Sequence, residues 1–185
     1  NLNKTILFVS HDLDEALKIG SNIAIMESAR IIQYGPPEDI VLNPINPYVE
    51  DFVAHTNPLN VLLGRSLMTH AADLPRANGK VLADSEKGIW LDLKGTQLAG
   101  AECAGRTLAM QSCSTSLNAS LPATGTLAIT TPDVSMRRAI ELRYATELPV
   151  VIAEQGKLVG VLTDHNFYHA MLGKHFTCSQ QQMAS

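Results

Sequence analysis

Residues 1–56 carry an apolar pattern that predicts alternating strands and helices. The run Thr5–Val9 is mostly apolar and rich in branched and aromatic side chains, which predicts a buried, parallel strand. A helix follows it, because Asp12 and Glu15 have capping-box spacing and Gly20 can end the helix. A hairpin and two helices with proline in the first turn are predicted at residues 22–34, 36–41 and 46–53. The strand has no preceding partner, so this segment is expected to be the end of a larger domain.

Beyond the predicted boundary at Thr56–Pro58, the apolar positions first predict strands, and after about residue 126 they predict a regular alternation of strands and helices. A hairpin is predicted at 80–93 and a strand at 106–110, whereas residues 61–74 lack a clean helical stripe. A β-α-β-β-α pattern follows, with strands at 127–129, 149–152 and 158–162 and helices at 135–144 and after Thr163. The fold class is therefore mixed α/β (α+β), with segments at 1–56, 57–116 and 117–174 and a flexible tail at 175–185.

Composition and charge narrow the function classes. The 185 residues are 45% hydrophobic, and no apolar run approaches the roughly 20 residues of a membrane-spanning helix, so the chain is expected to be soluble. The net charge of −4 divides into −5 for residues 1–56 and +1 for the rest, without a basic stripe for nucleic acid. Three cysteines without C-x-x-C spacing argue against a disulfide framework and suit a reducing compartment.

The segment Ser10–Ala16 holds the strongest candidate for chemistry. His11 comes at the exit of the predicted buried strand, just before a helix, where α/β folds place ligand-binding groups. Its imidazole could hydrogen-bond a phosphate oxygen and orient an attacking water. The alternative is a histidine in a partly exposed loop without a ligand, and position alone favours that alternative.

The wider sequence around His11 closely resembles the end of the nucleotide-binding domain of ABC transporters. The similar segments are Val9–Leu17, Ile23–Gly35 and Pro36–Pro44, in the same order and with matching gaps. The resemblance is strongest to the ATP-binding subunits of glycine betaine, proline and choline importers, and it implies transport of a quaternary amine. It also implies that His11 is the switch histidine, which contacts the γ-phosphate of ATP and is needed for hydrolysis.

The same resemblance implies cofactors and partners that the chain alone cannot use. Full-length subunits bind ATP and Mg²⁺, but no G-x-x-x-x-G-K-[ST] loop occurs in this sequence. Phosphoryl transfer depends on that loop and on acidic metal-binding residues, so the chain is expected to be a terminal fragment without enzymatic activity and without a required cofactor. The implied partners are a second ATP-binding subunit in a homodimer and a transmembrane permease subunit. The implied location is cytoplasmic, peripheral to the inner face of the bacterial membrane.

The later part of the chain resembles a CBS module, a small regulatory β-α-β-β-α repeat. The similarity covers residues 126–172 and rests on Ser135–Tyr144, Pro149–Val151 and Gly160–Asn166, and residues 57–116 would be a degenerate partner repeat. The resemblance implies an adenine nucleotide beside Ile129, Val150, Thr163 and Asn166. Nucleotide-binding modules carry an aspartate where this chain has Asn166, and an uncharged amide should hold ribose more weakly.

Two other clusters are weaker candidates. Arg137, Arg138 and Arg143 start a basic helix surface that could sense ionic strength or contact anionic lipid, although a solvated face is the simpler interpretation. His165 and His169 have the spacing of two metal ligands, but no third ligand is evident and no metal is expected. The alternative to an importer subunit is a stand-alone CBS-type module for nucleotide sensing or dimerisation.

Overall fold

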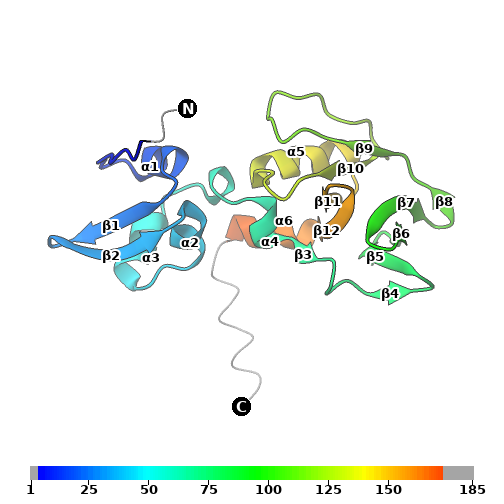
Figure 1. Cartoon of the computed structure of the whole chain (residues 1–185), viewed down its shortest axis with the longest axis horizontal. Helices are drawn as coiled ribbons and strands as arrows, with labels where there is room; N and C mark the ends of the chain where they lie inside the picture. The colour runs from blue at the N-terminus through cyan, green and yellow to red at the C-terminus, as the bar shows by residue number, and fades with distance from the viewer. Residues whose placement is uncertain (1–3, 173–185) are drawn as a thin grey trace, which may run out of the picture. The chain divides into compact units, whose positions relative to one another are not determined.

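The computed structural model describes residues 4–172, which fall into two compact units (Figure 1). The first unit extends to Val61 and the second begins at Leu62. The tail predicted at 175–185 lies outside the described residues. Within residues 4–172 no helix combines the length and the hydropathy that a membrane crossing requires.

The first unit contains the helices and the hairpin that the sequence predicts. They are α1 (Leu13–Ile19), β1 (Ile23–Glu27), β2 (Arg30–Gly35), α2 (Pro37–Leu42) and α3 (Pro47–Val53), followed by a 3₁₀ turn at Pro58–Asn60. Local signals set the helix starts: the side chains of Asp12 and Asn46 accept hydrogen bonds from Glu15 N and Val49 N. Buried residues of these elements form one small core, made of Leu17, Ile23, Ile25, Ile40, Val49, Val53 and Val61.

The strand predicted at Thr5–Val9 is not formed, so this prediction from the sequence is wrong. Ile6 is 85% exposed and Leu7 is 91% exposed, and Phe8 and Val9 are exposed as well. A strand exists only through hydrogen bonds to a neighbouring strand, and among the described residues none pairs with this segment. The run therefore keeps the composition of a buried strand without the partner that would bury it.

The second unit is built around one mixed sheet. Its elements are α4 (Gly64–Leu67), β3 (Thr69–His70), β4 (Arg76–Ala77), β5 (Lys80–Asp84), β6 (Ile89–Lys94), β7 (Gln97–Cys103), β8 (Arg106–Thr107), β9 (Met110–Ser112), β10 (Leu127–Thr130), α5 (Met136–Thr146), β11 (Val150–Glu154), β12 (Lys157–Leu162) and α6 (Asp164–Leu172). The strand order is β4-β5-β6-β7-β12-β11-β10-β9, with β3 also paired to β12 and β8 to β7. Strands from both predicted segments, 57–116 and 117–174, thus share this sheet.

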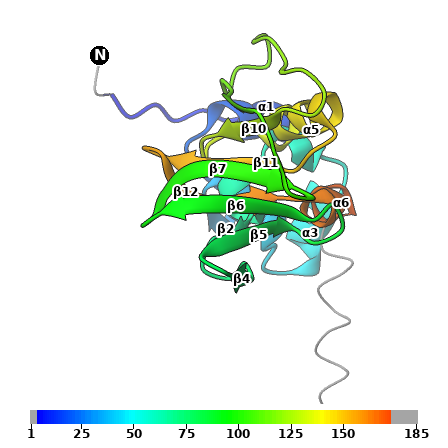
Figure 2. The same cartoon turned by 90° about the vertical axis from the view of Figure 1, so that its right-hand side faces the viewer.

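The strands β10, β11 and β12 are buried on both faces. Val151 and Val161 pack in a cluster with Val81, Ile89 and other residues of the β5–β6–β7 meander, whose strands lie side by side in Figure 2. Because side chains alternate along a strand, the neighbours of Val151 point to the other face. That face is covered by α5 and α6, which contact β10, β11 and β12. The meander and the helices therefore form two layers on either side of the central strands.

The strand predicted at 106–110 is divided into two. Ala104 and Gly105 form a turn with positive φ angles of 49° and 75°, which folds β8 back onto β7. After two further residues, β9 pairs in parallel with β10. The pattern of apolar residues cannot reveal this change of partner, because each partner lies elsewhere in the sequence.

Lys80 on β5 forms ion pairs with two carboxylates of the other meander strands, Asp92 on β6 and Glu102 on β7. This arrangement predicts that the stability of the fold depends on pH. Lys80 Nζ is 2.5 Å from Glu102 Oε2 and 3.3 Å from Asp92 Oδ1. The hydrogen bond with Glu102, and then the Asp92 side chain, raise the pKa of Lys80 above its ordinary value of 10.5, although burial opposes them. A group whose pKa is higher in the folded state than in the unfolded state stabilises the fold at pH values below its unfolded-state pKa. This stabilisation is lost as the pH rises through the folded-state pKa.

We therefore expect the Lys80→Met variant to be less stable than the parent chain at pH 8 and to approach it above the folded-state pKa of Lys80. Urea denaturation of both proteins at pH 8 and at stepwise higher pH measures the difference. A stability difference that stays constant over this series would contradict the assigned ion pairs.

Candidate functional site

The loop that carries His11 is fixed by its own side chains. Ser10 Oγ accepts a hydrogen bond from Asp12 N at 3.0 Å and donates one to Glu15 Oε2 at 3.2 Å. Asp12 Oδ1 accepts from Glu15 N at 3.1 Å, which closes the first turn of α1. These bonds hold the backbone on both sides of His11 while the imidazole stays exposed.

A surface hollow of about 490 Å³ lies beside His11 within the first unit. Its lining residues come from the start of α1 and from the end of α3 with the residues after it: His11, Asp12, Leu13, Asp14, Phe52, His55 and Thr56. The hollow contains two imidazoles and two carboxylates but no lysine or arginine. An isolated phosphate would therefore meet no fixed positive charge in this hollow.

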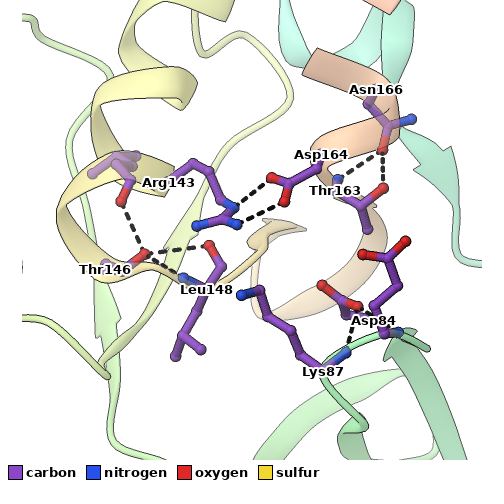
Figure 3. Close-up of polar contacts among 10 residues, drawn as sticks. Asp84, Lys87, Arg143, Thr146, Leu148, Thr163, Asp164 and Asn166 are labelled. Carbon is purple, nitrogen blue, oxygen red and sulfur yellow. Dashed lines mark hydrogen bonds and ion pairs between the residues drawn. The ribbon is translucent and has the colours of Figure 1, made fainter. Parts of the chain in front are cut away.

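The predicted nucleotide-binding residues of the second unit are largely occupied by internal contacts. Asn166 Oδ1 accepts from Thr163 N at 2.7 Å and from Thr163 Oγ1 at 2.9 Å, as Figure 3 shows. Asn166 Nδ2 donates to Leu67 O at 2.7 Å and to Thr69 Oγ1 at 3.3 Å. Val150 is fully buried, and Ile129 is half-buried. The structure thus brings Thr163 and Asn166 together and turns them toward each other.

The prediction of a basic helix surface at Arg137, Arg138 and Arg143 is wrong, because Arg137 is the only one of the three with a solvated side chain. Arg137 is 62% exposed at its side chain, whereas Arg138 is only 1% exposed. Arg138 donates to the carbonyl oxygens of Ser114, Ala119 and Ser120 and to Glu141 Oε2. Its guanidinium thus binds the 113–126 loop to α5 and is unavailable to solvent ions or lipid.

Arg143 is also engaged, and its partner joins the two helices of the second unit. Arg143 Nε and a terminal nitrogen each lie 2.7 Å from a carboxylate oxygen of Asp164, a bidentate pair between the end of α5 and the start of α6 (Figure 3). Thr146 Oγ1 donates to Leu142 O and accepts from Leu148 N, which closes the end of α5. Neither acidic partner was predicted from the sequence, although the i,i+3 spacing of Arg138 and Glu141 is a signal for that pair.

A smaller cavity of about 210 Å³ lies at the start of α6. Thr163, Asp164 and His165 form one wall, and the β5–β6 turn with Asp84 and Glu86 forms another. Leu74, Pro75, Leu82 and Ala83 supply apolar surface. Three of its six polar side chains are carboxylates, Asp84, Glu86 and Asp164, and no lysine or arginine among the described residues lines the cavity, so a bound phosphate would meet no fixed positive charge here.

Metal ligation finds no support among the described residues. No group of three or more histidine, cysteine or acidic side chains within residues 4–172 is arranged to hold a metal ion. His165 is exposed and His169 is half-buried on α6. Burial raises the pKa of the Cys113 thiol, which makes it a poorer nucleophile and ligand at neutral pH.

Comparisons with known proteins give a consistent set of relatives. No protein-family profile matches the chain. No solved structure matches it either. The glycine betaine/carnitine transport ATP-binding protein GbuA of Listeria monocytogenes is 28% identical over 184 residues, covering 93% of this chain and 45% of the relative.

Relatives that match over shorter segments have higher sequence identity to this chain. The glycine betaine transport ATP-binding protein OpuAA of Bacillus subtilis is 48% identical over 71 residues, covering 38% of this chain and 17% of the relative. The glycine betaine/proline betaine ATP-binding protein ProV of Escherichia coli is 53% identical over 49 residues, covering 26% of this chain and 12% of the relative. The chain spans less than half the length of these relatives. The homologues of this chain are therefore ATP-binding subunits of ABC transporters for glycine betaine, carnitine and choline, which confirms the predicted resemblance.

Proposed function

We propose that this chain is the C-terminal, regulatory part of the ATP-binding subunit of an ABC importer for a quaternary amine such as choline or glycine betaine. The observation that carries the proposal is the self-capped His11 loop in a chain whose relatives are named as ATP-binding proteins of such transport systems. In the full-length subunit, ATP and Mg²⁺ are held by parts outside this sequence. His11 then binds the γ-phosphate and orients the attacking water.

The exposed run at residues 5–9 supports the same proposal. Four consecutive apolar side chains, Ile6 to Val9, are exposed on both faces of the segment. Such a run is typical of a central parallel strand covered on both sides. We propose that it pairs with strands of the remaining subunit and thereby places His11 at the edge of that sheet.

Partners and location follow from the proposed subunit. The complete protein acts as a homodimer of ATP-binding subunits on a transmembrane permease, at the inner face of a bacterial membrane and without nucleic acid. Names of relatives support glycine betaine, carnitine or choline as the class of transported solute.

We propose a CBS-like regulatory role for the second unit, with the repeat at 117–174. The element order β10-α5-β11-β12-α6 supports this assignment. The segment 57–116 then acts as a β-meander that covers the central strands, since its only α-helix is the four-residue α4. The filled hydrogen bonds of Asn166 favour regulation without an adenine nucleotide.

We expect the isolated chain to release phosphate from Mg·ATP only at the buffer rate, because the phosphate-binding loop is missing. A chimera in which this chain replaces the segment of GbuA that it matches should regain ATP turnover. Phosphate release by both proteins, with GbuA as the positive control, tests the proposal. Turnover by the isolated chain, or a folded chimera without turnover, would contradict it.

The alternative is a stand-alone CBS-type sensing or dimerisation module. Its support is that the second unit has a core of its own, formed by the meander and the central strands. A folded chimera without turnover, together with saturable binding of an adenine nucleotide to the isolated chain, is the result expected for this alternative.

A further inference from the structure

Asn166 is a polar side chain in an almost fully buried place, with 7% of its surface exposed. An amide offers two acceptor lone pairs on its oxygen and two donors on its nitrogen. Thr163 N and Thr163 Oγ1 donate to the oxygen, and the nitrogen donates to Leu67 O and Thr69 Oγ1. All four positions are used, and the two ends of the amide serve two segments about a hundred residues apart in the sequence.

The segment on the nitrogen side is the connector, defined as residues 62–70, through which the chain enters the second unit. Backbone bonds fix the connector at several points: Gly64 N donates to Val134 O at 2.7 Å, and Met136 N donates to Leu62 O at 2.8 Å. β12 also approaches it closely, because a Cβ on Gly160 would lie 2.6 Å from Thr69 O. Leu62, Gly64 and Met68 of the connector are thus buried in the second unit, whereas Arg65 is exposed.

The segment on the oxygen side is the first turn of α6. Thr163 precedes the helix, and Asn166 Oδ1 at the third helical position accepts a hydrogen bond from Thr163 N, which is one half of a capping box. Both side-chain and backbone donors of Thr163 are therefore satisfied internally. A ligand that took these donors would have to displace Asn166 Oδ1.

We infer that Asn166 is a two-ended link that fastens the connector to the first turn of α6, so that a change at that turn is transmitted to the segment through which the chain enters the second unit. The two ends have different chemistry, since one end only accepts and the other only donates. An aspartate in this position keeps both acceptors for Thr163 and loses both donors to the connector. The connector end can therefore be released while the helix cap remains.

Hydrogen exchange of the whole chain, followed by mass spectrometry, tests this inference. In the Asn166→Asp variant, amides of residues 67–71 should exchange about tenfold faster or more, as expected for the loss of hydrogen bonds from a buried group. Amides in the first turn of α6 and in β10 and β11 should keep their rates. Unchanged exchange at 67–71, or an equal rise in α6, β10 and β11, would overturn the inference.

A second variant approaches the link from the connector. Thr69→Val removes one acceptor of the Asn166 amide without placing a charge near it. We expect a smaller acceleration confined to the same amides, so the inference stays testable if the aspartate variant fails to fold. Faster exchange in α6 but not at 67–71 would show that Asn166 serves only the helix cap.

Discussion

Replacing Arg138 by methionine should destabilise the second unit by about 2–4 kcal/mol, the range for lost charge-assisted hydrogen bonds at a buried site. Methionine keeps most of the aliphatic stem, so the loss falls on the guanidinium contacts rather than on packing. Those contacts join three carbonyl oxygens of one loop, from Ser114 to Ser120, and the Glu141 carboxylate. Glu141 is partly exposed and can be hydrated in the variant, which keeps the expected effect below that of a fully buried ion pair.

Tryptophan fluorescence during urea denaturation is a direct measurement of this effect. Trp90 is the only tryptophan of the chain and lies on β6, within the second unit. Arg137→Met is the matched control, because Arg137 is the preceding residue of α5, is solvated, and should change stability by less than about 0.5 kcal/mol. Equal effects of the two substitutions would show that the buried guanidinium contributes no more than a surface one.

Elements with local signals were predictable from the sequence. Asp12, Asn46 and Ser135 each precede a helix, and each accepts the expected hydrogen bond from the backbone of the first turn. Capping depends on residues two or three positions apart, so the sequence contains the whole interaction. The strands of the regular β-α-β-β-α pattern were found for a similar reason, because apolar runs between turn residues mark them.

Features that depend on distant partners were not predictable. The sequence shows that Thr5–Val9 has the composition of a strand, but strand formation depends on a neighbour. It shows three arginines on one helix, but not that the 113–126 loop returns to cover Arg138. Asn166 was interpreted as a weakened ribose ligand, whereas its contacts with Leu67 and Thr69 arise only when the connector packs against α6. In each case the feature depends on contacts between residues that are far apart in the sequence and meet only in the tertiary structure.

The His11→Ala substitution in the GbuA chimera should lower ATP turnover by about 100-fold or more, comparable to removing one positioned hydrogen-bond donor from a transition state. ATP binding should be largely preserved, since nucleotide affinity is proposed to depend on a phosphate-binding loop outside this chain. The local structure should also survive, because the loop is held by Ser10, Asp12 and Glu15 and the imidazole is exposed. The expected result is therefore a lower kcat at nearly constant nucleotide affinity.

Steady-state phosphate release and equilibrium nucleotide binding, measured on the same preparations, separate these two effects. His70→Ala is a suitable control, because His70 is an exposed histidine on β3 of the second unit and is far from His11 in the sequence. A loss of ATP affinity as large as the loss of turnover would mean that His11 contributes to ground-state binding. Unchanged turnover would mean that the imidazole does not act at the γ-phosphate, and the assignment of the switch histidine would have to be abandoned.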